Sequence, residues 1–193
     1  MDPLLLVLGI IGAIVIIGAI ISIVIFNSLV TTLRQVENAW AQIDVQLKRR
    51  ADLIPNLVES VKGYAKFEKS VLTGVTQART AILSAKSPKE SAKANNMLAG
   101  ALKTIFAVAE AYPTLQASQN FKALQEELSS TENKVAFARQ FYNDMVMKWN
   151  TMIAVFPNSI FAGMFNMNKP KEFFEASEDE KKAVKVDFSD MGK

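Results

Sequence analysis

Apolar residues recur at spacings of three and four along most of this chain. The first series after residue 26 consists of Leu33, Val36, Trp40, Ile43, Leu47, Ile54, Leu57 and Val61. Such spacing averages about 3.5 residues, the repeat of one helical face that packs against other helices. No segment of similar length alternates apolar and polar residues as a half-buried strand does. The pattern therefore predicts an all-α fold, an antiparallel helical bundle with coiled-coil-like seams.

The first series passes Pro55 without losing its phase. Apolar residues, rather than Gly, Asn or Asp, flank this proline. We therefore predict a kink in a continuing helix and not a hairpin. The expected helix covers about residues 27–85 and grows directly out of the segment that precedes it.

Start and stop signals predict two further helices. The segment "SPKES" is typical of a helix start, with Ser87 as N-cap and Pro88 at the first helical position. It predicts a helix over about 88–111, and a third apolar series predicts a helix over about 118–156.

The segment from Leu4 to Phe26 is apolar and carries no charge. Its 23 residues would extend about 34 Å as a helix, enough to cross the hydrocarbon core of a bilayer. Only three residues precede it and the helical pattern continues past it, which favours a retained anchor over a cleaved signal peptide. The expected organisation is a short tail and anchor over 1–26, a helical bundle over 27–165 and a C-terminal tail over 166–193.

The tail begins where a Phe- and Met-rich stretch ends and the chain becomes strongly charged. The stretch contains Ile160, Phe161, Met164 and Phe165. Three roles are open for it: it caps the bundle, docks on a neighbouring protomer or lies in the membrane interface.

Charge and cysteine content add the expected sidedness and exclude one class of partner. Basic residues flank the apolar segment only on its C-terminal side, beginning at Arg34. The positive-inside rule therefore predicts an outside N-terminus and a bundle in the cytoplasm. The net charge is +3 and the charges of both signs are interspersed, which argues against nucleic acid as a partner. The absence of cysteine fits either side of the membrane.

The sequence carries no recognisable catalytic chemistry. The chain has no His and no Cys, which excludes Ser-His-Asp triads, Cys nucleophiles and the usual zinc and di-iron sites. No lysine has a serine three residues before it, and glycines beyond the apolar segment are too sparse for a phosphate-binding loop. We therefore expect no enzyme, no catalytic residue, no metal or cofactor site and no small-molecule substrate.

Arg50 occupies a position of the first seam where an apolar residue is expected. One interpretation is an edge residue whose stem packs on the seam and whose head reaches solvent. Another is a polar hinge: Pro55 leaves the Ala51 carbonyl without its helical donor, and Arg50 binds that carbonyl together with a carboxylate such as Glu110 or Glu132. In that case Arg50→Met should cost several kcal/mol.

A lipid-binding patch over residues 48–50 is a third interpretation of the same stretch. A straight helix places this patch about 36 Å beyond Phe26, out of reach of the headgroups. The patch would therefore require the helix to fold back toward the membrane.

Six further positions are candidates for interaction rather than chemistry. Arg79 and Arg139 lie beside the seams, where arginines are more often edge residues than ligand contacts. In the apolar segment, two small-x-x-x-small pairs permit close approach of another helix, namely Gly9 with Ala13 and Gly18 with Ser22.

Several long motifs resemble the LemA family. They are "ENAWAQIDVQLKRRADLIPNLVESVKGYAKFEKSVL" over 37–72, "AVAEAYPTLQASQNFKALQEELSSTENKVAFARQFYND" over 107–144, and "FPNSIFAG" over 156–163. The resemblance covers about residues 27–174. Ala51 stands where the family often has an aromatic residue, and the charged tail is outside the shared pattern.

The resemblance implies a bacterial inner-membrane protein with a single N-terminal span, a helical bundle and no established enzymatic activity. Magnetosome-associated members suggest membrane shaping, and other relatives are encoded near membrane protease or envelope stress components. We therefore expect a membrane scaffold that forms homo-oligomers on the lipid bilayer. The alternative is an adaptor or regulator for a membrane protease or envelope stress protein.

Overall fold

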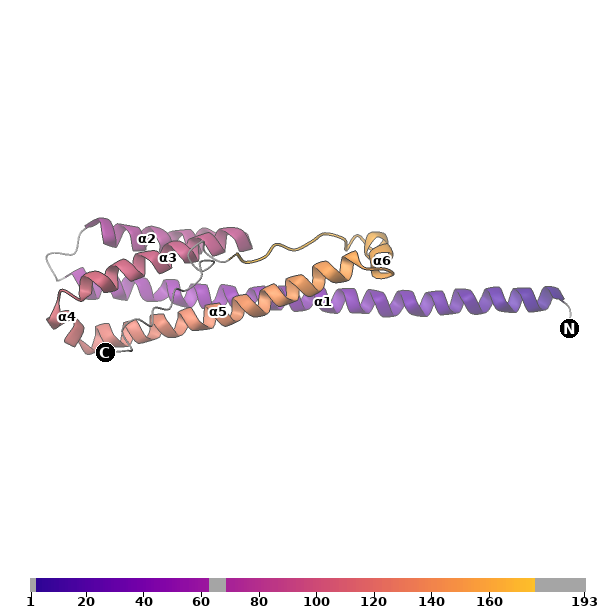
Figure 1. Cartoon of the computed structure of the whole chain (residues 1–193), viewed down its shortest axis with the longest axis horizontal. Coiled ribbons are helices and arrows are strands. Elements are labelled where there is room, and N and C mark those ends of the chain that lie inside the picture. Colours follow the sequence, from indigo (N-terminus) through magenta and orange to yellow (C-terminus); the bar gives the residue numbers. More distant parts are fainter. Residues whose placement is uncertain (1–2, 63–68, 176–193) are drawn as a thin grey trace, which may run out of the picture. The chain divides into compact units, whose positions relative to one another are not determined.

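The computed structural model describes residues 3–62 and 69–175, and the described residues contain six helices and no strand. The helices are α1 (Pro3–Lys62), α2 (Lys69–Ser84), α3 (Pro88–Ala109), α4 (Pro113–Ala117), α5 (Gln119–Ala154) and α6 (Asn158–Met164) (Figure 1). The predicted all-α fold, with one long apolar N-terminal helix that continues into the helical part of the chain, is confirmed.

The chain folds into two compact units, and α1 and α5 each contribute to both. The first unit comprises Met1–Asp44 and Ala136–Phe173, and the second comprises Val45–Val135 and Phe174–Lys193. Of the second unit, residues 63–68 and 176–193 lie outside the described residues. Each unit is therefore described by itself.

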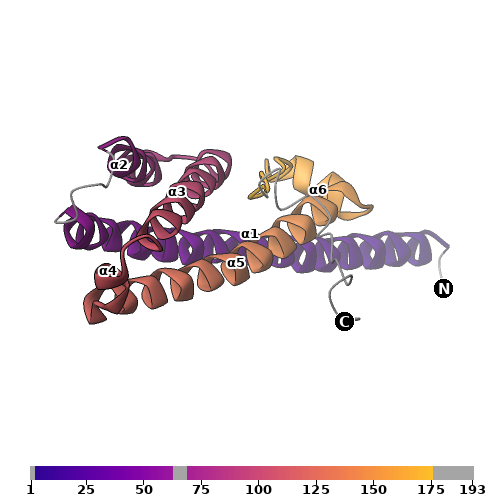
Figure 2. The same cartoon turned by 60° about the vertical axis from the view of Figure 1, so that its left-hand side comes forward.

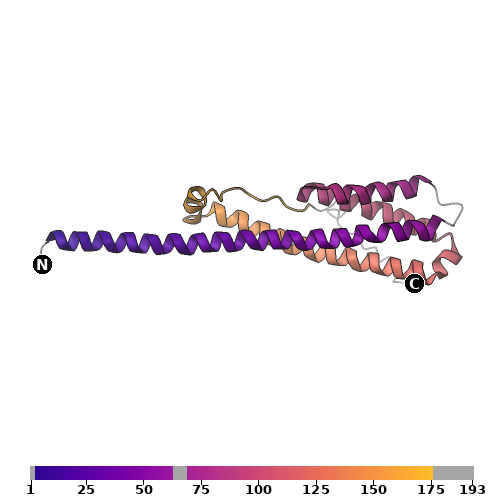
Figure 3. The ribbon, with the colours of Figure 1, turned by 180° about the vertical axis from the view of Figure 1, so that it is seen from behind.

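Helix α1 is one uninterrupted helix that includes the whole apolar segment (Figure 3). Among the described residues it is the one helix long and apolar enough to cross a membrane. Residues 3–21 are exposed along all sides of the helix, and packing begins at Ile25 and Leu29. The end of the apolar sequence therefore coincides with the start of packing by the rest of the first unit.

The prediction of one helix over 27–85 is wrong. The Arg79 side chain of α2 donates a hydrogen bond from Nε to the Ala51 carbonyl of α1, with the two atoms 3.1 Å apart. In one helix these two residues would lie about 42 Å apart. Helix α1 does run through Pro55, as predicted, and the chain then packs back as α2.

Helices α2 and α3 lie side by side as a pair (Figure 2). The Ser87 hydroxyl accepts a hydrogen bond from the Glu90 amide at 3.2 Å, so α3 begins with the predicted N-cap and with Pro88 at its first position. The next predicted helix, over about 118–156, corresponds to α5. The short helix α4 precedes it, is separated from it by the extended Ser118, and was not predicted. A further helix, α6, follows Pro157 and was not predicted.

A C-terminal strap over residues 166–173 follows α6 and is bonded to α5 in the first unit. Trp149 Nε1 donates to the Lys169 carbonyl at 3.0 Å, and Asn150 donates to and accepts from the Lys171 backbone. The Tyr142 hydroxyl donates to the Glu172 carbonyl at 2.8 Å. Burial, and next the charge of Glu172, raises the pKa of Tyr142 to about 12. The strap therefore remains bound to α5 through its backbone carbonyls.

Candidate functional site

The second unit is built around a buried arginine. Arg50 keeps the phase of the α1 seam between Leu47 and Ile54 and is only 2% exposed. The interpretation in which its head reaches solvent therefore does not hold. Burial lowers the pKa of Arg50, and the opposite charge of Glu132 counters part of this effect.

Two partners bind the Arg50 guanidinium. Nη1 donates to the Asn95 side-chain oxygen of α3 at 2.8 Å, and Nη2 forms an ion pair with the Glu132 carboxylate of α5. Arg50 Nε is buried and has no hydrogen-bond partner among the described residues. One arginine thus connects α1, α3 and α5 of the second unit, and of its three side-chain nitrogens Nε has no partner among the described residues.

The ion pair is asymmetric. The Arg50 side chain is almost fully buried, whereas 42% of the Glu132 side chain is exposed. The cost of several kcal/mol expected for Arg50→Met requires that a buried carboxylate be left without its partner, and Glu132 keeps access to water. The buried charge that needs a partner is the arginine.

The Ala51 carbonyl beside Pro55 is bound by a different arginine from the one predicted. Arg79, half-buried on α2, supplies the donor that Pro55 lacks. The sequence analysis assigned both the Ala51 carbonyl and a carboxylate to Arg50, whereas the structure divides these contacts between Arg79 and Arg50. The role of this stretch as a hinge stays a prediction.

Arg79→Met is expected to destabilise the protein by about 1.5 kcal/mol, because a charged donor to a buried carbonyl is lost. In a Pro55→Ala background the restored backbone amide at position 55 can bond the Ala51 carbonyl itself, so the same change should cost under about 0.5 kcal/mol. Denaturant unfolding of the full chain in mild detergent, followed by helical circular dichroism, measures both values.

Arg49→Met is the matched control for this cycle, because Arg49 pairs with Glu127 on the exposed surface. An exposed pair contributes at most about 1 kcal/mol, and its loss should be the same in both backgrounds. An equal cost of Arg79→Met with and without Pro55 would contradict the role given to Arg79.

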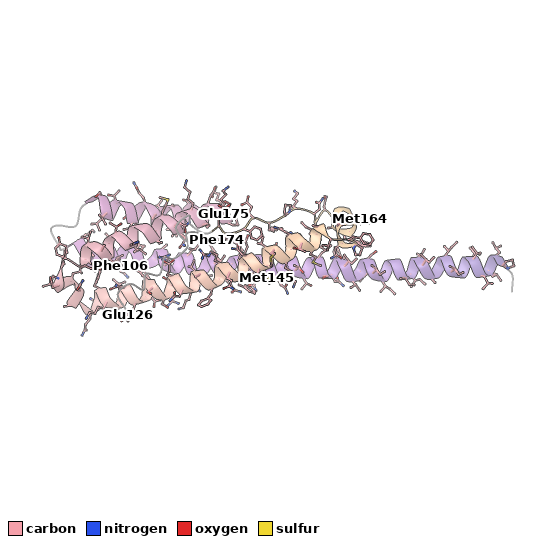
Figure 4. The ribbon with its side chains drawn as sticks, viewed as in Figure 1. Phe106, Glu126, Met145, Met164, Phe174 and Glu175 are labelled. Carbon is pink, nitrogen blue, oxygen red and sulfur yellow. The ribbon has the colours of Figure 1, made fainter. Side chains whose placement is uncertain are left out.

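An open groove of about 520 Å³ lies beside Arg50 in the second unit. Its lining includes the apolar residues Leu102, Phe106 and Leu128 and the charged residues Arg50, Glu110 and Glu132. Glu110, the other carboxylate considered for Arg50, is exposed and lines this groove. Figure 4 labels Phe106 on α3 and the exposed Glu126 on α5 of the same unit.

No group of three or more His, Cys, Asp or Glu side chains that could hold a metal ion occurs in 3–62 and 69–175. The only buried charged side chain among these residues, Arg50, is bound to Glu132 and Asn95.

The other candidate positions lie in the first unit. Arg139 is half-buried on α5. Gly9 and Gly18 face open space, since an added Cβ would have no neighbour within 4 Å. Ser22 donates to the Gly18 carbonyl at 2.7 Å within α1. The use of these small-residue pairs for helix association stays a prediction.

A second groove, of about 710 Å³, lies in the first unit just beyond the apolar segment. Its α1 side is polar from the first turn, with Asn27, Ser28, Thr31 and Gln35, and Lys148 of α5 lies opposite. Lys148 Nζ donates to the Gln35 side-chain oxygen at 3.2 Å. This groove was not predicted, although the abrupt change from apolar to hydroxyl and amide residues after Phe26 was a signal for it.

Asn95 was also missed. It lies three residues before Leu98 and seven before Leu102, so it is a polar residue on the apolar face of α3. A polar residue at seam spacing is the sequence signal that would have identified the partner of Arg50.

Comparison with known proteins gives a family and several relatives. Residues 39–188 match the model of the LemA family. The chain is 28% identical to Protein LemA of Metamycoplasma hominis over 86% of this chain and 74% of the relative. It is 24% identical to Magnetosome protein MamQ 2 of Paramagnetospirillum magneticum and 23% identical to Magnetosome protein MamQ of Magnetospirillum gryphiswaldense. Each of these two matches covers 78% of this chain but 65% of the relative, so the chain spans slightly less than two thirds of the magnetosome proteins.

Proposed function

Since this chain belongs to the LemA family, we propose that it is a non-enzymatic scaffold, anchored in the bacterial inner membrane by α1 and assembled from copies of itself. The relatives and the apolar N-terminal segment of α1 fit a single-pass membrane protein. The charges after the span favour a bundle in the cytoplasm.

Exposed aromatic side chains on α5 carry the proposal of self-association. Phe137 is 73% exposed, and Phe141 is exposed one helical turn further along the same face. The Tyr142 ring lies 5.4 Å from that of Trp40, which is 14 residues beyond Phe26 on α1. Trp40 and Tyr142 are thus about 21 Å from the end of the apolar segment by helical rise. Phe137 and Phe141 lie beside Tyr142 or further along α5 from α6, so they are too far away to meet lipid acyl chains.

A second copy of the chain is the occupant that we propose for the exposed pair Phe137 and Phe141. Exposed apolar clusters on a soluble surface commonly mark protein contacts. Anchored copies share one plane, so their effective concentration is high and a small contact area is sufficient. The names of the two MamQ relatives place them at magnetosomes, which is consistent with a role for this chain in membrane organisation or shaping.

The mass of the full-length protein in mild detergent tests self-association. We expect an assembly well above the monomer, which shifts toward the monomer in Phe137→Ser/Phe141→Ser. Met147→Ser is the matched control, since Met147 is exposed on a different side of α5 and should leave the mass unchanged. A chain reduced to residues 27–193 tests the contribution of the anchor.

Monomers at every concentration would contradict the scaffold. They would favour the alternative function, an adaptor for a membrane protease or envelope stress protein. Crosslinking in cells from a cysteine at position 137 would then be the way to capture that protein.

A further inference from the structure

Helix α6 and the residue before Pro157 present an apolar face that nothing in the described part of the first unit covers. Phe156 is 80% exposed and Met164 is 71% exposed, and Ile160 is exposed between them. Ile160 and Met164 are spaced by four within α6 and so lie on one side of this helix. The opposite side packs inward through Ala162, which is fully buried.

The structure places α6 at the end of the apolar segment of α1. The Phe165 ring, directly after α6, contacts the Phe26 ring edge-on, with the two centroids 4.8 Å apart. Phe26 is the last residue before the chain becomes polar at Asn27. Figure 4 labels Met164 on α6, beside α1. The exposed apolar face is therefore at the depth at which α1 leaves the hydrocarbon core.

Both ends of α6 are fixed at this depth. Helix α5 leads into it through Pro157, and the strap leads out of it and is bonded to Trp149 and Asn150. Tyr142 is about 21 Å beyond the end of the apolar segment, and Trp149 lies seven residues closer to α6 on the same helix. Seven residues rise about 10 Å, so Trp149 is about 10 Å beyond the end of the apolar segment. An element held in this way cannot withdraw its apolar face from the boundary without breaking the strap.

The polar residues at the same end of the first unit suit the headgroup layer. Asn27, Ser28 and Thr31 line a groove within about 8 Å of Phe26 by helical rise. Lys148 and Lys169 are exposed near the level of Trp149, where their side chains can approach lipid phosphates. An apolar face at the acyl boundary beneath hydroxyl, amide and lysine groups is typical of an interfacial element.

We propose that α6 is a membrane-interfacial helix, whose Ile160 and Met164 face inserts, together with the exposed Phe156 that precedes the helix, into the leaflet from which α1 emerges. The occupant of this face is lipid, because the face is continuous at Phe26 with a segment that is itself expected to be in lipid. The inference rests on the anchoring part of the proposed function and is independent of self-association. It also gives a physical origin for membrane shaping, since α6 adds volume to one leaflet only.

Single-cysteine variants of the full chain test this inference directly, because the protein has no native cysteine. Ile160→Cys, Ile16→Cys and Phe137→Cys, all at exposed positions, are labelled with a nitrobenzoxadiazole fluorophore. The proteins are reconstituted in phosphatidylcholine–phosphatidylglycerol vesicles that carry a nitroxide either high or low on the acyl chain. Fluorescence with and without nitroxide gives the depth of each label.

The label at position 160 is expected to be quenched about twofold or more by the shallow nitroxide and less by the deep one. The label at position 16 should be quenched most by the deep nitroxide, and the label at 137 by neither. Position 137 is the matched control, since it also carries an exposed apolar side chain but lies far from the boundary.

Three results would overturn the inference. Equal, weak quenching at 160 and 137 with strong quenching at 16 would remove α6 from the membrane and leave the anchor intact. A blue-shifted label at 160 without lipid quenching would mean that another protein surface covers α6. Absence of quenching at 16 would reject the anchor, and the inference with it.

Discussion

Glu132→Ala is expected to destabilise the protein by about 3 kcal/mol. This cost is larger than the one expected for Arg50→Met, the other change that breaks the ion pair between Arg50 and Glu132. The change leaves the Arg50 guanidinium buried with Asn95 as its only partner among the described residues. This destabilisation is at the lower end of the range for removing one partner of a buried ion pair, because the Glu132 side chain is itself partly exposed to water. Denaturant unfolding of the full-length protein in mild detergent measures it.

Arg50→Met removes the buried charge itself and should cost only about 1 kcal/mol. Glu132 can then be hydrated, methionine fills most of the arginine stem volume, and the main loss is a hydrogen-bond partner for the buried Asn95 oxygen. The double variant Arg50→Met/Glu132→Ala should therefore be more stable than Glu132→Ala alone. Glu126→Ala, an exposed carboxylate on the same helix, is the control and should be near neutral. A larger cost for Arg50→Met than for Glu132→Ala would contradict the asymmetry of this pair.

Trp149→Ala is expected to cost about 4 kcal/mol, because it removes a large side chain that is fully buried in the first unit. It also removes the indole donor to the Lys169 carbonyl and so loosens the strap. The free energy of unfolding and the rate of proteolytic cleavage within residues 166–173 measure the two effects. Both should change in this variant.

Two smaller changes separate packing from strap attachment. Trp149→Phe keeps most of the burial but loses the hydrogen bond, and should cost about 1.5 kcal/mol. Asn150→Ala removes both hydrogen bonds to Lys171 and should accelerate strap cleavage at a cost of only about 1–2 kcal/mol. Unchanged strap cleavage in all three variants would mean that these contacts do not hold the strap.

The sequence predicts best where the signal is periodic. The apolar segment, the seam of α1 and the N-cap of α3 were predicted because each depends on neighbours within a few residues. Arg50 was recognised as unusual for the same reason, since it interrupts a seam whose phase is otherwise regular. Its carboxylate was narrowed to two candidates, of which the structure selects Glu132.

The errors concern contacts between residues distant in sequence. The reversal before α2 was missed because apolar residues keep the same spacing on both sides of it, so periodicity alone cannot distinguish one helix from two. Arg79 was taken for an edge residue because only the packing of α2 against α1 brings it to Ala51. The strap has no periodicity at all, and its hydrogen bonds to α5 use backbone carbonyls that carry no sequence signal.

The unbroken course of α1 through Phe26 makes the first unit a rigid extension of its anchor. No proline or glycine interrupts the helix between Gly18 and Asp44, and the unit packs on α1 from Ile25 onward. A span that tilts by about 20° to match a thinner bilayer must therefore tilt the first unit by the same angle. In the proposed scaffold, local bilayer thickness would therefore set the angle at which each copy meets its neighbours.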